Sequence, residues 1–99
     1  MTKIKIADLE MDVKTKEVKR AGKPINLTPK EYDLLHYLML NANQVVSRKT
    51  ILNKIWRYSP EIESRVVDVY VGYLRKKIDF KNRKKLIRSI RSFGYSIKK

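Results

Sequence analysis

The segment at residues 65–78, RVVDVYVGYLRKKI, restricts the possible folds more than any other part of the chain, because it has two contrasting helical faces. Apolar side chains recur at positions i, i+4, i+7 and i+11, the spacing that places them along one side of an α-helix. They are Val67, Val71, Leu74 and Ile78. The other side carries Arg65, Val69, Gly72, Tyr73 and Lys76, flanked by Arg75 and Lys77. We therefore expect a helix, capped by Ser64, that buries its apolar side and offers its cationic side to a polyanion.

The charge of the chain favours an anionic partner. Its 99 residues suffice for one small domain, and they carry 24 Lys and Arg against 10 Asp and Glu, a formal net charge of +14. Nucleic acid fits this balance best, and an anionic membrane surface or an acidic protein are the alternatives. The chain has no cysteine, which excludes disulfides and thiolate zinc sites, and no apolar run as long as a membrane span. We expect a soluble, cytoplasmic protein that needs no metal or cofactor and does not bind membranes.

The first quarter of the chain alternates apolar and polar residues in short runs. This pattern predicts four strands, at residues 4–6, 9–13, 17–20 and 24–27. Polar or glycine-containing turns separate them, so we expect a small antiparallel sheet with one apolar face.

A capping signal follows the sheet. Thr28 can cap a helix in which Pro29 is the first residue and Glu31 the third, so that the two polar side chains cap reciprocally. The helix should run over residues 29–41 and end where an asparagine can adopt a left-handed conformation. His36, the only histidine, lies in this helix and lacks the partners that a catalytic or metal site needs. The expected inward side chains are Leu34, Leu35, Leu38, Met39 and Ala42, widened by Tyr32, Tyr37 and Leu40.

The remaining segments predict a second helix and a terminal hairpin. After an extended link at 45–46, Ser47 can cap a helix at 48–56 with Ile51, Leu52 and Ile55 inward. A loop at 57–63 leads into the helix at 65–78, and a basic turn at 79–85 leads to strands at 86–91 and 95–97. Two closely joined helices, the second basic, indicate a helix-turn-helix relative, and the basic hairpin indicates a wing that reaches the minor groove.

At this point the chain resembles the winged-helix effector domain of OmpR/PhoB-type response regulators, over essentially its whole length. The matching pieces are LTPKEYDLL at 27–35, VSR at 46–48, Ile51-Leu52, Ile55-Trp56, VDVYV at 67–71, LRKK at 74–77, Ile90-Arg91 and Gly94-Tyr95. The resemblance implies an α+β winged helix-turn-helix with an N-terminal four-stranded antiparallel sheet, a three-helix core and a C-terminal β-hairpin wing. The recognition helix, 64–78, would lie in the major groove and the wing, 86–98, at the minor groove of DNA.

The resemblance also implies biological partners. Family members regulate transcription from direct-repeat DNA sites, usually as tandem dimers, and some contact RNA polymerase. In the family this domain follows a receiver domain that a sensor kinase controls through a phosphorelay. Residues 1–99 contain no receiver, so we expect one effector domain, either isolated or in a stand-alone form.

Several residues of the recognition helix are candidates for DNA contacts. Arg65 is placed for a phosphate or a base edge, and Val66 and Val69 for thymine methyl groups. Asp68 either accepts a hydrogen bond from cytosine or, as we favour, pairs with a cation such as Arg65 or Arg75 to hold the helix. The remaining candidates on this helix are Tyr70, Gly72, Tyr73, Arg75 and Lys76. The tyrosine hydroxyls suit phosphates, and their rings equally suit the edge of the core.

The resemblance implies further roles, some on that helix and some outside it. Arg75 matches a phosphate contact, Arg91 a minor-groove arginine, and Ser89 and Tyr95 phosphate contacts. Trp56 matches a residue that packs and offers its indole N–H to a phosphate; we favour the packing role. The family often has basic residues at Gly72 and Tyr73, and glycine at Ser92. A glycine at 72 leaves room for close approach to the DNA backbone. The loop matching the polymerase contact includes Arg57, Tyr58, Glu61 and Glu63.

Two other functions remain open beside specific DNA binding. The charge alone would suit a non-specific nucleic-acid-binding module, and the basic helix could instead dock on an acidic protein. An enzyme is the least favoured, since one histidine, no cysteine and no clustered carboxylates leave no visible nucleophile, base or metal site.

Overall fold

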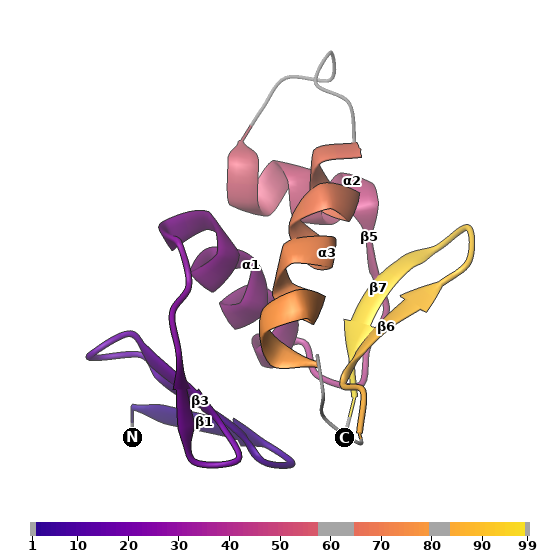
Figure 1. Cartoon of the computed structure of the whole chain (residues 1–99). Coiled ribbons are helices and arrows are strands. Elements are labelled where there is room, and N and C mark those ends of the chain that lie inside the picture. The colour runs from indigo at the N-terminus through magenta and orange to yellow at the C-terminus, as the bar shows by residue number, and fades with distance from the viewer. Residues whose placement is uncertain (1, 58–64, 80–83, 99) are drawn as a thin grey trace.

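Among the described residues, three helical segments lie between two small sheets (Figure 1). The computed structural model describes residues 2–57, 65–79 and 84–98. The predicted α+β winged helix-turn-helix, with its N-terminal sheet, three helices and C-terminal hairpin, is confirmed. Within the described ranges, no helix has the length and apolar character needed to cross a bilayer.

The N-terminal sheet is the predicted antiparallel meander. Strands β1 (Lys3–Ile6), β2 (Leu9–Asp12), β3 (Glu17–Arg20) and β4 (Lys23–Ile25) pair in chain order. The register sets Met11 opposite Val18 and Ile6 opposite Leu9. All four side chains are buried, so the alternating pattern gives the sheet its one apolar face.

Helix α1 (Pro29–Leu40) begins with the predicted capping box. The Thr28 N–H donates to Glu31 Oε1 at 2.9 Å and the Glu31 N–H donates to Thr28 Oγ1 at 3.3 Å. Most predicted inward residues are buried, whereas Ala42 and Tyr37 are half-buried. The prediction for Leu40 was wrong: it is 63% exposed, because the helical rotation sets it opposite the centre of the buried stripe. The C-cap residue Asn41 is not left-handed (φ −109°); Asn43 is (φ 69°).

The second predicted helix exists but changes its winding. It divides into α2 (Arg48–Ile51) and the π-helical segment η1 (Leu52–Trp56). Ser47 caps α2 by accepting from the Thr50 N–H at 3.1 Å. At the other end the left-handed Arg57 (φ 53°) donates its N–H to the Leu52 carbonyl at 3.1 Å, a bond across five residues.

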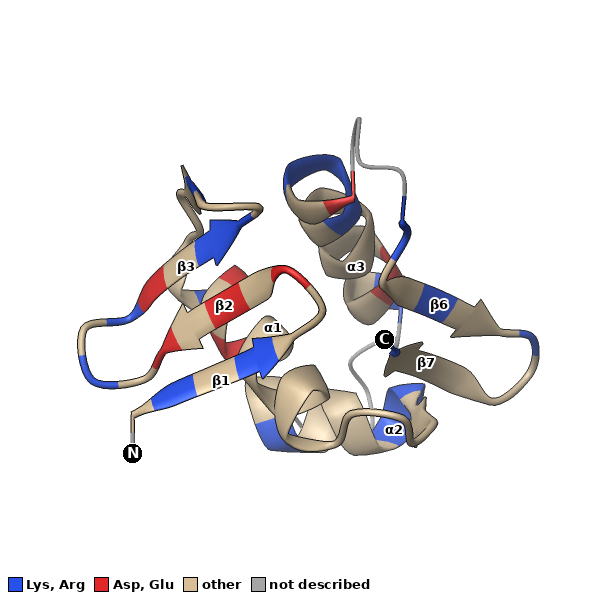
Figure 2. Cartoon of the chain, turned by 90° about the horizontal axis from the view of Figure 1, so that it is seen from below, with Lys and Arg blue, Asp and Glu red and all other residues tan. Residues whose placement is uncertain are grey.

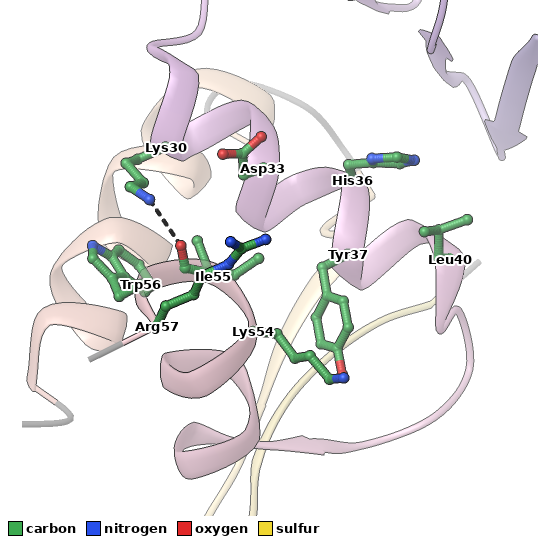
Figure 3. Close-up of a pocket in the computed structure, with 9 residues that line it drawn as sticks. All are labelled: Lys30, Asp33, His36, Tyr37, Leu40, Lys54, Ile55, Trp56 and Arg57. Carbon is green, nitrogen blue, oxygen red and sulfur yellow. Dashed lines mark hydrogen bonds between the residues drawn. The ribbon is translucent and has the colours of Figure 1, made fainter. Parts of the chain in front are cut away.

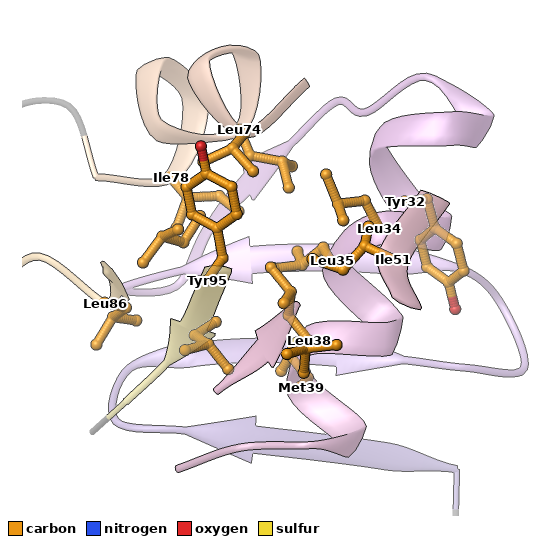
Figure 4. Packing of buried hydrophobic residues seen from close by; sticks show 14 of the residues in the cluster. Tyr32, Leu34, Leu35, Leu38, Met39, Ile51, Leu74, Ile78, Leu86 and Tyr95 are labelled. Carbon is orange, nitrogen blue, oxygen red and sulfur yellow. The ribbon is translucent and has the colours of Figure 1, made fainter. Parts of the chain in front are cut away.

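Helix α3 (Arg65–Ile78) packs as its sequence predicts. Val67, Val71, Leu74 and Ile78 are each at most 1% exposed. They join side chains of α1 and of the C-terminal strands in one apolar core (Figure 4). The predicted cap Ser64 lies outside the described residues.

The C-terminal hairpin consists of β6 (Ile87–Ile90) and β7 (Gly94–Ile97), and it projects from the body of the domain in both Figure 1 and Figure 2. Its base is widened by β5 (Val46–Ser47), which pairs with β7 in a three-stranded sheet of order β5-β7-β6. The sequence predicted only an extended link at 45–46. A Cβ at Gly94 would lie 2.0 Å from the Val46 carbonyl oxygen, so this close pairing requires glycine.

A buried ion pair connects the N-terminal sheet to the end of α3. Arg20 and Asp79 are 4% and 3% exposed. The Arg20 guanidinium donates to Asp79 Oδ1 at 3.0 Å, to Asp8 Oδ1 at 2.5 Å, and to the carbonyls of Ile78 and Lys84. Asp79 also accepts the N–H groups that open β6, from Leu86 and Ile87, both at 3.1 Å. The sheet therefore holds the C-terminus of α3 and the start of the wing in place.

Candidate nucleic-acid interface

The outward face of α3 is exposed, as its sequence pattern predicts. Val69 and Tyr73 are 42% and 45% exposed, and Arg65, Lys76 and Lys77 are exposed as well. The predicted contact residues beside this face are half-buried: Val66, Asp68, Tyr70, Gly72 and Arg75. Nothing lies within 4 Å of the place where a Cβ would stand at Gly72, so the helix backbone is open there.

An aromatic series runs from the core to this face. The Trp56 and Tyr70 rings meet edge to face with centroids 5.1 Å apart, and Tyr70 meets Tyr73 in the same way at 5.3 Å. Trp56 is 8% exposed, so the packing role favoured for it is what the structure shows. Tyr70 packs against the core edge, while Tyr73 faces outward.

Asp68 joins three elements through one carboxylate oxygen. Its Oδ1 accepts the Arg48 Nε–H at 2.7 Å and the Tyr95 hydroxyl. Burial disfavours the charged carboxylate, but the hydrogen bonds from Tyr95 and Arg48 outweigh it and hold the pKa of Asp68 below its ordinary value. The structure thus places Asp68 in an ion pair, with Arg48 of α2 as the cation instead of Arg65 or Arg75. Sequence reasoning missed Arg48; its only signal was its place in the VSR piece.

A second set of contacts joins the wing to α2 and α3. The guanidinium carbons of Arg48 and Arg75 lie 5.7 and 5.8 Å from the Tyr95 ring centroid, within cation–π range. Arg75 also donates to the Ser89 hydroxyl of β6 at 2.5 Å. Tyr95 is 6% exposed and its hydroxyl is engaged by Asp68, whereas Ser89 is exposed. These contacts set the angle between helix and hairpin.

A cationic cleft separates the last turn of α3 from β6. It encloses about 610 Å³. Its lining residues are Arg75, Lys76, Asp79, Lys85, Ile87, Arg88 and Ser89. The one carboxylate in this set, Asp79, is already paired with Arg20, so the cleft presents positive charge. Figure 2 shows basic residues on this turn of α3, on β6 and at the hairpin turn, where Arg91 is exposed.

A second groove lies between α1 and η1 (Figure 3). It encloses about 470 Å³ and includes His36, Asp33 and three basic side chains. The Lys30 ammonium donates to the Ile55 carbonyl at 2.8 Å across this groove. His36 lies against the Tyr32 ring, with centroids 5.7 Å apart. In the part of the chain that the structure describes, no group of three or more His, Cys, Asp or Glu is arranged to hold a metal.

The predicted polymerase-contact loop is described only at its first residue. Arg57 is exposed and borders the α1–η1 groove. Tyr58, Glu61 and Glu63 lie outside the described residues.

A three-helix core, a basic amphipathic third helix and an adjoining β-hairpin define a winged helix-turn-helix protein. Residues 22–97 match the family model described as "Transcriptional regulatory protein, C terminal". The chain therefore belongs to this family, the OmpR/PhoB-type winged-helix DNA-binding domains of transcription regulators.

Individual relatives agree with this assignment. The uncharacterized transcriptional regulatory protein YkoG of Bacillus subtilis is 45% identical over 91 residues, which are 92% of this chain and 40% of YkoG. The response regulator DrrB of Thermotoga maritima, an OmpR/PhoB homologue, has a TM-score of 0.88 at 32% identity, over 99% of this chain and 45% of DrrB. The DNA-binding domain of Klebsiella pneumoniae RstA, in complex with the RstA box, has a TM-score of 0.88 at 25% identity, over 99% and 98%. The chain spans about two fifths of the length of the curated relatives it matches.

Proposed function

We propose that this domain is the DNA-binding effector part of a two-component response regulator, and that it binds specific double-stranded sites in order to regulate transcription. Helix α3 would lie in the major groove and the 86–98 hairpin at the adjoining minor groove. The observation that carries the proposal is the exposed face of α3 beside a basic hairpin, with the two elements linked through Asp68–Tyr95 and Arg75–Ser89. One solved relative of nearly the same length, the DNA-binding domain of RstA, is in complex with the RstA box.

On α3, exposure and chemistry divide the proposed contacts into two kinds. Arg65, Lys76 and the hydroxyl of Tyr73 suit phosphates, which fix the register on the duplex. Val69, supported by the half-buried Val66, suits thymine methyl groups, which carry sequence information. At Gly72 the bare backbone allows the DNA to approach closely. Asp68, with its carboxylate held by Arg48 and Tyr95, acts by orienting the helix.

The remaining contacts lie near the wing. Arg75 and Ser89 border the cationic cleft, which suits a phosphate, and Arg91 suits the negative potential of a narrow minor groove. Trp56 has little exposed surface, so its proposed phosphate contact would be made from the edge of the core. The Tyr95 hydroxyl donates its hydrogen to Asp68, so we propose that Tyr95 orients the helix and the wing instead of donating to a phosphate. If about six phosphates are neutralised per domain, log K should fall with log salt with a slope near −5.

The wider setting follows the family. We propose that the domain acts by binding alone, without catalysis, and works in the cytoplasm after a receiver domain that a sensor kinase phosphorylates. Direct-repeat sites would hold two copies in tandem. The segment that begins at Arg57 would contact RNA polymerase, and the negative charges of Glu61 and Glu63 would suit a basic polymerase surface.

Selection of bound sequences from a random duplex pool tests the DNA-binding proposal. We expect one enriched motif, and binding to it that survives a large excess of random duplex at physiological salt. Affinity that random duplex abolishes would instead indicate a non-specific module. If Val69→Ser and Tyr73→Ser leave DNA affinity unchanged, α3 is not the reading element, and a protein-docking role would be favoured.

A further inference from the structure

The turn of the wing carries an exposed phenyl ring. Phe93 is 69% exposed, more than any other large apolar side chain in the described ranges. The others are Leu40, Val45, Tyr73 and Val69. A single exposed apolar residue needs no explanation by itself. What matters here is that three of the five, Val69, Tyr73 and Phe93, lie on α3 and the hairpin, the two elements proposed to hold DNA.

The backbone of the turn holds Phe93 in a defined place. Its N–H donates to the Ile90 carbonyl at 2.9 Å, which closes a four-residue turn. Ser92 has φ 69° at the third position of that turn, where a type II turn requires a positive φ. On the other side, Gly94 pairs with both Ile90 and Ser47. The ring therefore extends from a fixed turn at the end of a hairpin that projects from the domain (Figures 1 and 2).

The same turn carries an arginine. Arg91 is exposed two residues before Phe93. A guanidinium is attracted by the negative potential of a narrow minor groove, and an apolar side chain there contacts deoxyribose and can wedge against a base step. Arginine beside an apolar wedge is thus a combination that suits the minor groove.

We propose that Phe93 is a DNA-contacting residue, whose ring packs against deoxyribose and a base step in the minor groove beside Arg91. This inference rests on the proposed function. The ring should favour a flexible pyrimidine–purine step at its position, because such steps unstack most easily. It would add sequence preference at a place where the family resemblance supplies only an arginine.

The test is a titration of a duplex that bears a single selected site, at several salt concentrations. Phe93→Ser should weaken DNA binding by about tenfold, because the apolar contact of the ring with deoxyribose and the base step is lost. The slope of log K against log salt should not change, because no phosphate contact is lost. Phe93→Leu should keep most of the affinity. Leu40→Ser, at a similarly exposed leucine outside both elements, is the matched control and should bind like the wild type.

Two further comparisons separate the possible outcomes. In the same titration, Arg91→Ala should make the salt slope shallower by about 1, as expected for a lost cationic contact. Replacing a pyrimidine–purine step beneath the wing by a stiff A-tract step should cost the wild type more affinity than it costs Phe93→Ser.

Unchanged affinity of Phe93→Ser on the single site would overturn the inference. A loss seen only on a duplex with two tandem sites would overturn it as well, since the ring would then contact a neighbouring copy of the protein. Failure of the proposed function looks different: the wild type itself would show no preference for any selected site over random duplex.

Discussion

Tyr95 of β7 donates its hydroxyl hydrogen to Asp68 Oδ1, the same oxygen that accepts the Arg48 Nε–H. One carboxylate of α3 therefore holds both the helix before it and the wing after it. Because the ion pair is partly exposed, it should contribute little to the free energy of unfolding. Its importance lies in geometry: it orients the two elements that are proposed to share one duplex.

Asp68→Asn should weaken DNA binding roughly tenfold, because a misplaced helix affects all contacts together. The affinity for the selected site and the affinity for each of its single-base variants should fall by a similar factor. Tyr95→Phe should have a similar effect, and the double variant should be little worse than either single one. Fluorescence anisotropy on the selected site and its single-base variants measures this. A change of preference at one base pair only would show instead that Asp68 reads cytosine.

Glu31→Gln should cost about 1 kcal/mol of stability at pH 7, because the buried carboxylate accepts from the Thr28 N–H and from the Lys77 ammonium of α3 at 2.6 Å. Burial opposes the charge, but these two partners outweigh it and lower the pKa of Glu31. A lowered pKa contributes stability above the unfolded value, about 4.3 for Glu, and that contribution disappears as pH falls through the folded value.

Urea unfolding between pH 7 and pH 3 checks this prediction. The wild type should lose its advantage over Glu31→Gln below about pH 4.3. Lys30→Gln, at a neighbouring cation on the same helix, is a control that should not reproduce this acid dependence. An advantage that persists unchanged at pH 3 would show that the Glu31 charge does not contribute.

Arg20→Met should destabilise the domain by about 3–5 kcal/mol, because it removes the only cation among the described residues that pairs with the buried Asp79 carboxylate, together with the guanidinium hydrogen bonds to the carbonyls of Ile78 and Lys84. Lys19→Met changes an exposed neighbour on the same strand and should alter stability by less than about 0.5 kcal/mol. The free energies come from urea titrations. Equal effects of the two substitutions would contradict the structural role assigned to Arg20.

Sequence patterns predicted the elements whose signal is local. The capping box at Thr28 and Glu31 and the buried stripe of α3 are each contained in a few turns of chain, so periodicity and side-chain chemistry suffice. The Arg20–Asp79 pair joins residues 59 apart, and Arg48 meets Asp68 over 20 residues. Such contacts depend on how elements pack, which no local pattern encodes. Strand β5 has only two residues, too few for an alternation to show.

The family resemblance predicted a more specific function than the composition did. Charge and an amphipathic helix left DNA, RNA and acidic proteins open as partners, whereas the ordered family motifs predicted a winged helix and named candidate DNA-facing residues. The resemblance did not supply Arg48 as the partner of Asp68, because the partner is known only once α2 and α3 are placed together.

Gly94→Ala should destabilise the domain by roughly 3 kcal/mol or more, since its Cβ would overlap the backbone of β5 and its φ of 152° is unfavourable for other residues. Gly22→Ala is the matched comparison. It also has a positive φ, 79°, but nothing within 4 Å of the added Cβ, so it should cost only about 1–2 kcal/mol. Thermal or urea unfolding of both variants separates steric overlap from backbone strain, and equal losses would show that β5 yields to the methyl group.

Gly72→Ala should affect stability and binding in opposite directions. Gly72 lies inside α3 with open space around its Cα, so alanine should stabilise the helix by about 0.5–1 kcal/mol. If the bare backbone lets the duplex approach closely, the added methyl group should weaken binding to the selected site several-fold, despite the more stable fold. Urea unfolding and anisotropy titrations on the same protein sample measure the two effects. A variant that is both more stable and an equally tight binder would show that the DNA backbone does not reach Gly72.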